Sequence, residues 1–519
     1  KNCINEDQSG FIKGRYIGEN VRLVLDIIDH CNEERLSALI LTCDIKQAYD
    51  CMDWDYLKRA IASFGFGEAF KKWIKILYDS DPSCAATARV QINGMLSEPY
   101  FIERGLRQGC PASCLLFLLG FEPLLQGIRK SRNVKGLTFL DDEVKILAYA
   151  DDATLVIDGT PRSLKTCLKI FDDFKSVSGL QLNYDKTQAM WIGENAKEKL
   201  PIQTDPCISW PTCPIEILGV KICNEPNADT ALINYKSKLN PIKRRLNVWN
   251  GKSLTPFGRI HLLKSEILSQ LVYLLTVLPE PNSEFFKEIE TQMFSFVWGG
   301  KRDKIKRSTL KSKYKNRGLK FPDLREMARS LKITWVRKFI DRENKAKWKS
   351  VMEHKLRINN DTTFFHCNAS HKPIDSCVRS KFWRETIAAW MTVKENQEIS
   401  GSEILNEVLW NNKLVNIEKR KIFHKQNVID KGLIRVRDIY NISEKRLMSA
   451  NEVATKFSLH PMNAMVFLRS IPQTWRQKLI TEKPTYPHDT DIFEDIKEIH
   501  KKSQWAYHKL QNRWPSIPQ

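Results

Sequence analysis

Two apolar segments that lead into acidic residues constrain the fold of this chain more than any other feature of its sequence. Residues 38–43 (ALILTC) run directly into Asp44, which predicts a buried strand with a carboxylate at its tip. Residues 146–157 are apolar on both sides of the tetrapeptide Tyr149-Ala-Asp-Asp152, which predicts a hairpin with two aspartates at its turn. A carboxylate at such a place is costly unless it is hydrogen-bonded, paired or bound to a metal ion.

Helical patterns accompany these strands. Residues 57–78 and the leucine-rich run 113–128 each predict a helix. A further helix that ends at Gly179 is predicted by apolar residues at helical spacing: Leu164, Cys167, Leu168, Phe171 and Phe174. A sheet with acids at its turns and helices packed beneath it predicts an α+β palm over residues 1–225. After residue 226 strand signals nearly vanish, and residues 259–278 and 283–298 predict amphipathic helices.

The charge of the chain indicates a polyanionic partner. There are 82 Lys and Arg against 61 Asp and Glu, a formal net charge of +21, and each phosphate that a basic residue neutralises releases a condensed counterion. Acidic membrane lipid would suit the same charge. The longest apolar runs, 114–121 and 267–278, are nevertheless too short to span a bilayer. Charge alone therefore leaves nucleic acid and a membrane surface as alternatives.

The cysteines and the first residues bear on where the chain works. The 13 cysteines show no paired spacing, and Cys43, Cys114 and Cys167 lie in apolar runs. This pattern predicts reduced thiols in an intracellular protein of the nucleus, the cytoplasm or both, rather than in a secreted one. The chain opens with Lys-Asn-Cys, without an initiator Met or a signal peptide, so we expect a fragment of a longer product.

The acids predict phosphoryl-transfer chemistry once their neighbourhood is considered. Two aspartates at a hairpin are by themselves ordinary turn residues. Between the two acid sites, however, lies the glycine-rich segment 104–113 (RGLRQGCPAS), where glycine lets backbone approach a base or phosphate and Gln108 offers a donor and an acceptor. Mg²⁺ prefers a few carboxylates completed by water and substrate phosphates. Two such ions about 4 Å apart stabilise both oxygens of an in-line transfer.

These segments together resemble the reverse transcriptases of non-LTR (LINE-type) retrotransposons. The sequence motifs of the family's palm occur in order at residues 44–50 (DIKQAYD), 107–113 (RQGCPAS), 149–152 (YADD), 179–186 (GLQLNYDK) and 217–219 (ILG). Residues 8–15 (QSGFIKGR) match a segment typical of the fingers. Weaker matches at 254–260, 296–298 and 318–323 continue after the palm. The resemblance implies a right-hand polymerase with a palm over 1–225, a helical thumb over 226–345 and a basic, mostly helical region over 346–519.

The resemblance also implies a catalytic role for specific residues. Asp44, Asp151 and Asp152 correspond to the metal-binding catalytic triad, which would hold two Mg²⁺ (or Mn²⁺) ions. Tyr149 would position these acids, although packing within the hairpin is an equally good interpretation. Tyr49 corresponds to the aromatic residue that excludes a ribose 2′-hydroxyl and so selects deoxynucleotides; the alternative is a tyrosine of the core.

Further correspondences concern the substrates. Gln108 and Gly109 would line the nascent base pair, and Lys186 would assist pyrophosphate departure, with a solvated lysine as the alternative. The primer grip would be formed by Ile217, Leu218 and Gly219, which are equally consistent with an apolar strand. Asp50 is interpreted as a structural cap or an ion-pair partner rather than a metal ligand.

Basic residues outside the palm predict contacts to nucleic acid. Residues 301–320 hold ten Lys or Arg and one acid, with Trp298 or Tyr314 available for stacking on bases. The residues expected to contact nucleic acid are Arg15, Lys311, Lys313 and Arg317. A charged segment that serves only solubility is the alternative.

Two departures from the family pattern leave rival hypotheses open. The fingers segment with its triphosphate-binding basic residues is expected to be truncated, and Cys367, His371 and Cys377 have too irregular a spacing for structural zinc. The leading hypothesis is an RNA-directed DNA polymerase that uses an RNA template, a DNA primer and dNTPs, in a ribonucleoprotein with element RNA and without a membrane. The alternatives are an inactive nucleic-acid-binding remnant, an intron maturase or telomerase-like polymerase, and a membrane-surface protein.

Overall fold

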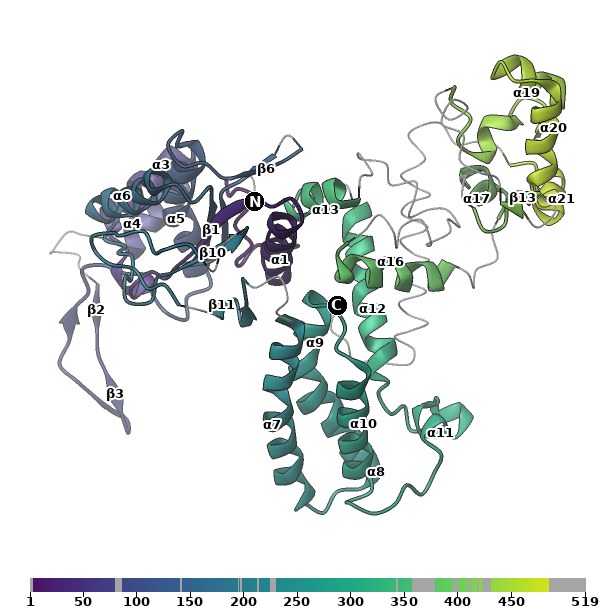
Figure 1. The fold of residues 1–519 in the computed structure, drawn as a ribbon. Helices are drawn as coiled ribbons and strands as arrows, with labels where there is room; N and C mark the ends of the chain where they lie inside the picture. Colours follow the sequence, from purple (N-terminus) through teal and green to yellow (C-terminus); the bar gives the residue numbers. More distant parts are fainter. Residues whose placement is uncertain are drawn as a thin grey trace. The chain divides into compact units, whose positions relative to one another are not determined.

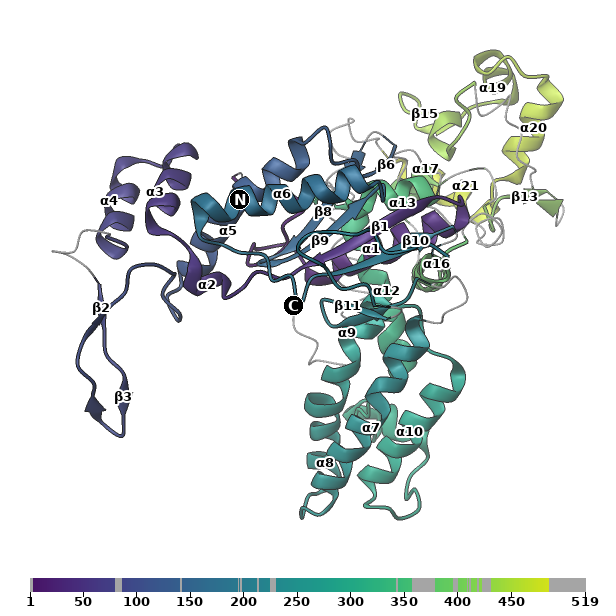
Figure 2. The same ribbon diagram turned by 60° about the vertical axis from the view of Figure 1, so that its left-hand side comes forward.

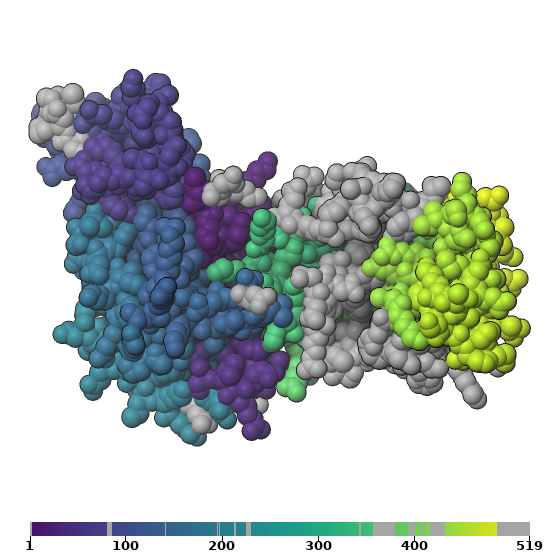
Figure 3. Space-filling view, turned by 90° about the horizontal axis from the view of Figure 1, so that it is seen from above, coloured from purple at the N-terminus to yellow at the C-terminus, as the bar shows by residue number. Residues whose placement is uncertain are grey.

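The structure is a computed structural model in which two compact units are defined by their internal contacts. One unit comprises Lys1–Asn234 and Glu343–Lys355, and the other comprises Tyr235–Arg342 and Leu356–Gln519 (Figure 1). In the space-filling view the N-terminal part of the first unit forms a continuous surface in purple and blue (Figure 3). The residues described are 3–79, 86–140, 142–194, 196, 198–211, 214–224, 230–341, 344–356, 379–394, 400–407, 409, 412–417, 420–421 and 431–484.

A four-stranded antiparallel sheet organises the first unit. The strands follow the order β10-β1-β9-β8 and comprise β1 (Ser37–Cys43), β8 (Ile146–Tyr149), β9 (Asp152–Ile157) and β10 (Gln188–Gly193). The predicted strand at 38–43 and the predicted hairpin at 146–157 are therefore confirmed. Strand β1 is a central strand, and its residues from Ala38 to Leu41 are fully buried. This is why it is apolar without alternation, as expected for a strand that is covered on both faces.

Helices cover the sheet. The core on one face joins Leu39 and Leu41 of β1 to side chains of α3 (Trp54–Ser63), α5 (Ser113–Lys130) and α6 (Pro161–Ser178); Figure 2 shows α5 and α6 along that face. Helix α1 (Ile17–Glu33) contacts β8 and β10. Helix α6 begins after the Thr160 cap and ends at Gly179 with φ 76°, a left-handed conformation that glycine adopts without strain. The α+β prediction is confirmed.

One predicted helix is wrong in its continuity. Residues 57–78 were expected to form a single helix, but they lie in α3 and α4 (Glu68–Leu77), with a break between them. Gly65 adopts φ 74° and Gly67 caps α4, so the Phe-Gly-Phe-Gly sequence ends one helix and starts the next. The apolar periodicity continues through both helices, which explains why it suggested a single one.

A helix from beyond residue 343 belongs to the first unit. In α13 (Trp348–Leu356), the side chains of Trp348, Val351 and Met352 are almost completely buried. The Lys355 ammonium lies 3.4 Å from a Glu33 carboxylate oxygen of α1. The Lys355 side chain, which is only 4% exposed, thus has its partner on a helix far away in sequence.

The described residues of the second unit are mostly helical, as predicted. Its longer helices are α7 (Thr230–Asn250, which begins in the first unit), α8 (Pro256–Leu262), the π-helix η1 (Leu263–Leu268), α9 (Ser269–Val277), α10 (Ser283–Val297), α12 (Leu324–Ile340) and α16 (Lys381–Lys394). The predicted helices at 259–278 and 283–298 are thereby confirmed. The stretch Pro256–Val277 is long and apolar enough to cross a membrane by length and composition, but half of its most apolar window is buried inside the structure, as in the core helix of a globular protein.

A separate small core organises the described residues near the C-terminus. It joins Ile404, Leu433 and Val453 with Phe467 and Trp475. The contributing elements are α17 (Gly401–Asn406), η3 (Val436–Ile439), α19 (Ala450–Lys456), α20 (Pro461–Ser470) and α21 (Gln473–Glu482). Two-residue strand pairs also occur here, namely β13 (Asn416–Ile417) with β14 (Arg420–Lys421) and β15 (Tyr440–Asn441) with β16 (Arg446–Leu447).

Candidate active site

The tip of β1 presents the first carboxylate. Asp44 follows Cys43, the last residue of the strand, and its carbonyl oxygen accepts a hydrogen bond from the Asn183 backbone N–H at 2.7 Å. The Asn183 side-chain amide donates to Asp44 Oδ2 at 3.0 Å, and Lys186 Nζ lies 3.6 Å from the same oxygen. The segment after α6 therefore orients the Asp44 carboxylate and partly neutralises it. Asn183 was not predicted as a site residue, although it lies within the motif at 179–186.

The hairpin of β8 and β9 presents the other two carboxylates. Tyr149 pairs with Asp152 across the hairpin, so Ala150 and Asp151 form its turn. Ala150 has φ 56°, a left-handed conformation that is uncommon for a residue with a side chain. Because β1 and β9 are adjacent, with Cys43 opposite Ala153, the turn lies next to the tip of β1. The structure thus brings together the three aspartates that the sequence predicted.

The three carboxylates influence one another electrostatically. Burial raises the pKa of Asp151, and the nearby charge of Asp44 raises it further, against a hydrogen bond from its own backbone N–H. Burial also raises the pKa of Asp152, followed by the charges of Asp151 and Asp44, while Lys186 opposes the change. Each shift shows that negative charge in this cluster is poorly compensated by the protein itself.

An open cleft of about 460 Å³ joins Asp44 and Asp152, but not Asp151, to the hairpin predicted to hold the primer. This second hairpin consists of β11 (Ile215–Ile217) and β12 (Val220–Ile222), and its turn residues Leu218 and Gly219 both have positive φ. The cleft is lined by Thr42, Cys43, Asp44, Asp152, Ala153, Thr154, Asp185, Lys186, Gln188, Glu216, Ile217, Leu218 and Gly219. The acids Asp185 and Glu216 were not predicted as part of the site.

Three of the predicted nucleotide-binding residues, Tyr49, Gln108 and Gly109, do not line this cleft. The Tyr49 ring stacks on Phe117, with the ring centres 5.2 Å apart. Burial raises the pKa of the Tyr49 hydroxyl, contacts with Cys114 add to this, and the charge of Asp151 raises it further. Tyr49 is therefore both packed in the core and within electrostatic reach of the catalytic turn, which suits either of its interpretations.

The loop that precedes α5 carries Gln108 and Gly109 at the surface. The Gln108 side-chain amide donates to Asp50 Oδ1 at 3.3 Å, which agrees with a structural partner role for Asp50. Gly109 has φ 81°, and a Cβ added there would meet nothing within 4 Å. This glycine is therefore required by the backbone conformation and not by close packing within the protein.

Two of the residues predicted to contact nucleic acid are instead engaged within the protein. The Arg15 guanidinium donates to the carbonyl oxygens of Ile4, Asn5 and Gln8 and forms an ion pair with Glu6. Its side chain is only 7% exposed. Arg15 thus braces the N-terminal segment, and its contact with nucleic acid stays a prediction.

Lys311 is also engaged within the protein, and its contact with nucleic acid likewise stays a prediction. Its ammonium lies 3.0 Å from carboxylate oxygens of both Glu290 and Asp323. Burial lowers the pKa of Lys311, but hydrogen bonds and charge from these two acids outweigh burial and raise it overall. The contact of Lys313 and Arg317 with nucleic acid stays a prediction. Tyr314 is 55% exposed, with Lys320 Nζ 4.9 Å from its ring centre.

Three residues that support the turn formed by Ala150 and Asp151, the candidate catalytic turn, were missed. The buried Gln8 carboxamide exchanges hydrogen bonds with Ala150, and Gly10 packs against the backbone of the same residue. Asn20 donates to the carbonyl oxygen of Ala148 at 2.9 Å. The motif at 8–15 contained Gln8 and Gly10, but the sequence gave no indication of which backbone they would contact.

Metal binding can be judged from the donor set. Among the residues that the structure describes, no group of three or more His, Cys, Asp and Glu side chains is arranged to hold a metal ion on its own. The aspartates Asp44, Asp151 and Asp152 supply only oxygen atoms and carry poorly compensated charge, which suits Mg²⁺ or Mn²⁺. A two-ion site at these aspartates stays a prediction. The candidate zinc ligands Cys367, His371 and Cys377 lie outside the described residues.

Comparisons with known proteins agree with these findings. Residues 2–222 match the family described as reverse transcriptase (RNA-dependent DNA polymerase). The chain is 25% identical over 461 residues to the transposon TX1 uncharacterized 149 kDa protein of Xenopus laevis, covering 87% of this chain and 34% of that protein. It is 25% identical over 195 residues to the retrovirus-related Pol polyprotein from the type-2 retrotransposable element R2DM of Drosophila melanogaster, covering 38% and 18%.

The chain spans about a third of the length of the TX1 protein and less than a fifth of the R2DM polyprotein. Among solved structures, apo telomerase from Candida tropicalis aligns with 12% identity and a TM-score of 0.35, covering 74% of this chain and 59% of that one.

Proposed function

Residues 2–222 are a reverse transcriptase domain of the kind found in non-LTR retrotransposons, and on this premise we propose that the chain is an RNA-directed DNA polymerase. It would extend the 3′ end of a DNA primer on an RNA template with dNTPs. The observation that carries the proposal is the convergence of Asp44, Asp151 and Asp152 beside a cleft that also contains the hairpin at 217–219. A merely structural cluster of acids would have bases to neutralise it, whereas here only Lys186 opposes the charge on Asp152.

The proposed reaction forms a bond between the primer 3′-oxygen and the α-phosphorus of the dNTP. The bond from that phosphorus to the oxygen that bridges it to the β-phosphate breaks, pyrophosphate leaves, and the proton of the primer 3′-hydroxyl passes to solvent. Two Mg²⁺ (or Mn²⁺) ions would supply positive charge for the attacking and leaving oxygens. Asp44 and Asp151 would hold them, with Asp152 as the third ligand. Lys186 would shift from Asp44 toward the departing pyrophosphate.

The other residues of the site would position the substrates. The hairpin of Ile217, Leu218 and Gly219 would hold the primer end against the acids, and Tyr49 would exclude a ribose 2′-hydroxyl by the volume of its ring. Gln108 and Gly109 would line the nascent base pair. The positive net charge of the chain would favour a ribonucleoprotein with element RNA, in the nucleus, the cytoplasm or both.

Primer extension on an RNA template with Mg²⁺ and dNTPs tests the proposal. We expect the wild-type chain to extend the primer and Asp151→Asn to lose extension while it binds RNA with unchanged affinity, because the exchange keeps the shape of the side chain and removes its charge. Asp173→Asn, an exposed acid on α6, is the matched control and should extend normally.

The remaining outcomes separate the alternatives. Salt-sensitive RNA binding by wild type without any extension would replace the proposal with a nucleic-acid-binding remnant. Loss of RNA binding by Asp151→Asn together with its activity would show that the exchange damages the fold. In that case Asp44→Asn, measured in the same way, decides whether the cluster is catalytic.

A further inference from the structure

We propose that Gln8 is the positioning residue of the catalytic turn, and that the ion pairs of its neighbour Asp7 hold Gln8 in place. The inference rests on the proposed function, because it assigns a role toward the carboxylates that would carry the chemistry. It concerns a part of the sequence far from the aspartates. It also gives a role to the segment after residue 343, for which the sequence offered none.

The Gln8 carboxamide clamps the turn from both sides of one residue. Its Nε2 donates to the carbonyl oxygen of Ala150 at 2.9 Å, and its Oε1 accepts from the Ala150 N–H at 2.8 Å. The same Oε1 accepts from the Gly10 N–H at 2.8 Å. Gln8 is 1% exposed, so water does not compete for these bonds. A single side chain thereby engages the carbonyl oxygen of the peptide unit that precedes Asp151 and the N–H of the peptide unit before it.

The segment around Gln8 also completes the edge of the sheet. Strand β8 is the last strand in the sheet order, and residues 7–9 run parallel to it beyond that edge. The Ser9 N–H donates to the Ala148 carbonyl oxygen at 2.8 Å, and the Ala148 N–H donates to the Asp7 carbonyl oxygen at 2.8 Å. The outer edge of β8 is therefore hydrogen-bonded at Ala148, the residue before Tyr149, where it would otherwise be an open strand edge.

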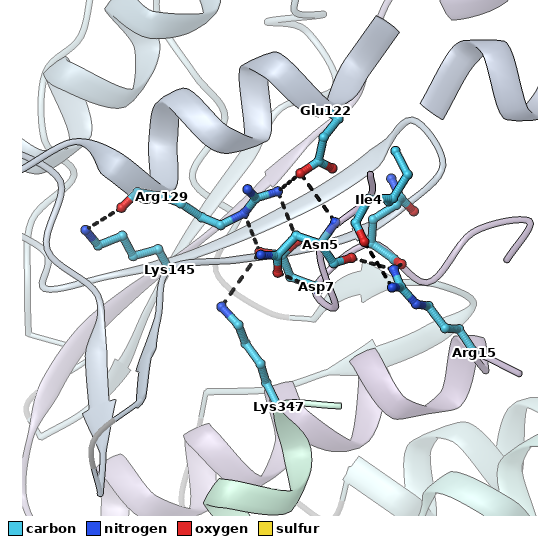
Figure 4. A network of polar contacts seen from close by, with 9 residues as sticks. Ile4, Asn5, Asp7, Arg15, Glu122, Arg129, Lys145 and Lys347 are labelled. Atoms are coloured by element: carbon cyan, nitrogen blue, oxygen red, sulfur yellow. Dashed lines mark hydrogen bonds and ion pairs between the residues drawn. The ribbon is translucent and has the colours of Figure 1, made fainter. Parts of the chain in front are cut away.

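Ion pairs anchor this segment to two distant helices. The Asp7 side chain is fully buried and lies 2.7 Å from Arg129 Nε at the end of α5 and 3.7 Å from Lys347 Nζ, just before α13 (Figure 4). Arg129 also contacts Glu122 at 2.5 Å, and Lys145 donates to the Arg129 carbonyl oxygen at 3.2 Å. A buried carboxylate with two cations has a strong preference for one position, and Gln8 is the next residue along the chain.

The turn needs such support for two reasons. Ala150 is held at φ 56°, which costs free energy relative to the ordinary backbone regions. The neighbouring Asp151 faces the like charges of Asp44 and Asp152, so repulsion tends to move the turn away from β1 when no cation is bound. A carboxamide is the side-chain group that can donate to a carbonyl and accept from an N–H at once. The Gln8 clamp therefore preorganises the carboxylates for metal ions and substrate.

The first test compares Gln8→Met and Gln8→Glu with Ser163→Ala. Methionine has a similar length but makes neither bond, and a glutamate carboxylate accepts but cannot donate to Ala150. Ser163 is as buried as Gln8 and hydrogen-bonded. It lies in α6, which follows the end of β9 that is farther from Asp152. It therefore reports the effect of losing a buried polar group away from the turn. Activities are expressed per folded molecule, with the folded fraction measured by thermal unfolding.

We expect both Gln8 variants to lose kcat by about 10- to 100-fold, since misplacement by about 1 Å can cost a factor of that size. The KM for primer–template should stay within about twofold of wild type, because Gln8 does not line the cleft that contains the hairpin at 217–219. Mn²⁺ binding to the nucleic-acid-free chain, followed by electron paramagnetic resonance, should weaken in parallel. Lys347→Met should show the same pattern with a smaller loss of kcat.

A purely structural role predicts a different result. If Gln8→Met and Ser163→Ala lose stability equally but keep kcat and Mn²⁺ affinity per folded molecule, the inference is overturned. Should Gln8→Met fail to fold, Gln8→Glu and Lys347→Met decide it by the same two measurements. If wild type itself extends no primer, the proposed function fails, while Mn²⁺ affinity still shows whether Gln8 positions the aspartates. Unchanged Mn²⁺ affinity in every variant would overturn the inference even then.

Discussion

Replacing Gly10 with alanine should disable the site through steric overlap at the catalytic turn. A Cβ at this position would lie 2.4 Å from the Ala150 backbone N and 3.0 Å from both Ala150 Cα and Gln8 Oε1. Ordinary contacts of a Cβ begin at 3.4 Å, so either Gly10 or the turn must move by about 1 Å, the difference between 3.4 and 2.4 Å. The backbone of Gly10 itself is not strained, and the added volume is the whole perturbation.

The expected magnitudes follow from this overlap. Overpacking of a buried site costs about 1–3 kcal/mol of unfolding free energy, which a folded domain of this size withstands. A shift of the turn by about 1 Å should lower kcat by roughly 100-fold, because Asp151 follows Ala150 directly. The assay is primer extension on an RNA template with saturating primer–template, together with urea unfolding of the same preparation.

The matched control is Gly127→Ala on α5. Its added Cβ would make one ordinary contact, 3.7 Å from Ile170 Cγ2, and glycine inside a helix is about 1 kcal/mol less favourable than alanine. We therefore expect Gly127→Ala to raise stability and leave kcat unchanged. A Gly10→Ala protein that is folded and extends primers within about threefold of the wild-type rate would refute the reasoning, since the turn would then tolerate displacement.

Three further predictions concern other parts of the chain. Replacing Tyr49 with a small residue should admit ribonucleotides in the extension assay, and unchanged sugar discrimination would remove its proposed role. Burial and the neighbouring histidine and lysine of α13 lower the pKa of His30 from 6.5 to about 4; the folded chain then binds fewer protons than the unfolded chain between these values. The free energy of unfolding should be unaffected by His30 above about pH 6.5 and should fall by on the order of 2 kcal/mol toward pH 4. His30→Phe should flatten this profile in urea unfolding. Lys311→Ala should cost about 1–3 kcal/mol of stability through its lost ion pairs, whereas Arg317→Ala should leave stability unchanged and weaken RNA binding in an anisotropy titration.

The sheet and its carboxylates were predictable because their signals are local. Two apolar runs predict where a strand lies and where it ends. One run ends in Asp44, and the other is interrupted at Asp151 and Asp152. The order of the motifs then placed Lys186 and the hairpin at 217–219 beside them, and the cleft contains both. The break between α3 and α4 was missed because apolar periodicity persists across Gly65, and only the backbone conformation reveals the turn.

The sequence says least about the contacts of basic residues, for a physical reason. A guanidinium or ammonium group binds a carbonyl oxygen, a carboxylate or a phosphate by the same charge-assisted bonds. Nothing in the residues around Arg15 or Lys311 states which acceptor is nearest in the folded chain. Arg15 meets backbone carbonyls, and Lys311 meets Glu290 and Asp323. The division into palm, thumb and C-terminal region also stays a prediction, because these names are defined by function and not by contacts.

The support of the catalytic turn shows what a local signal leaves out. The turn combines a left-handed Ala150 with like charges on adjacent strands, so its own sequence works against its conformation. Such a site persists only when surrounding structure determines it, and here the support comes from residues 7–10 and, through Asp7, from α5 and the residue before α13. A segment that follows α12 in the sequence therefore helps to hold the carboxylates of the sheet. Exchanges at Lys347 or Asp7 should therefore alter metal affinity, although neither residue is proposed to bind the metal. Sequence motifs alone will underestimate the set of residues on which this site depends.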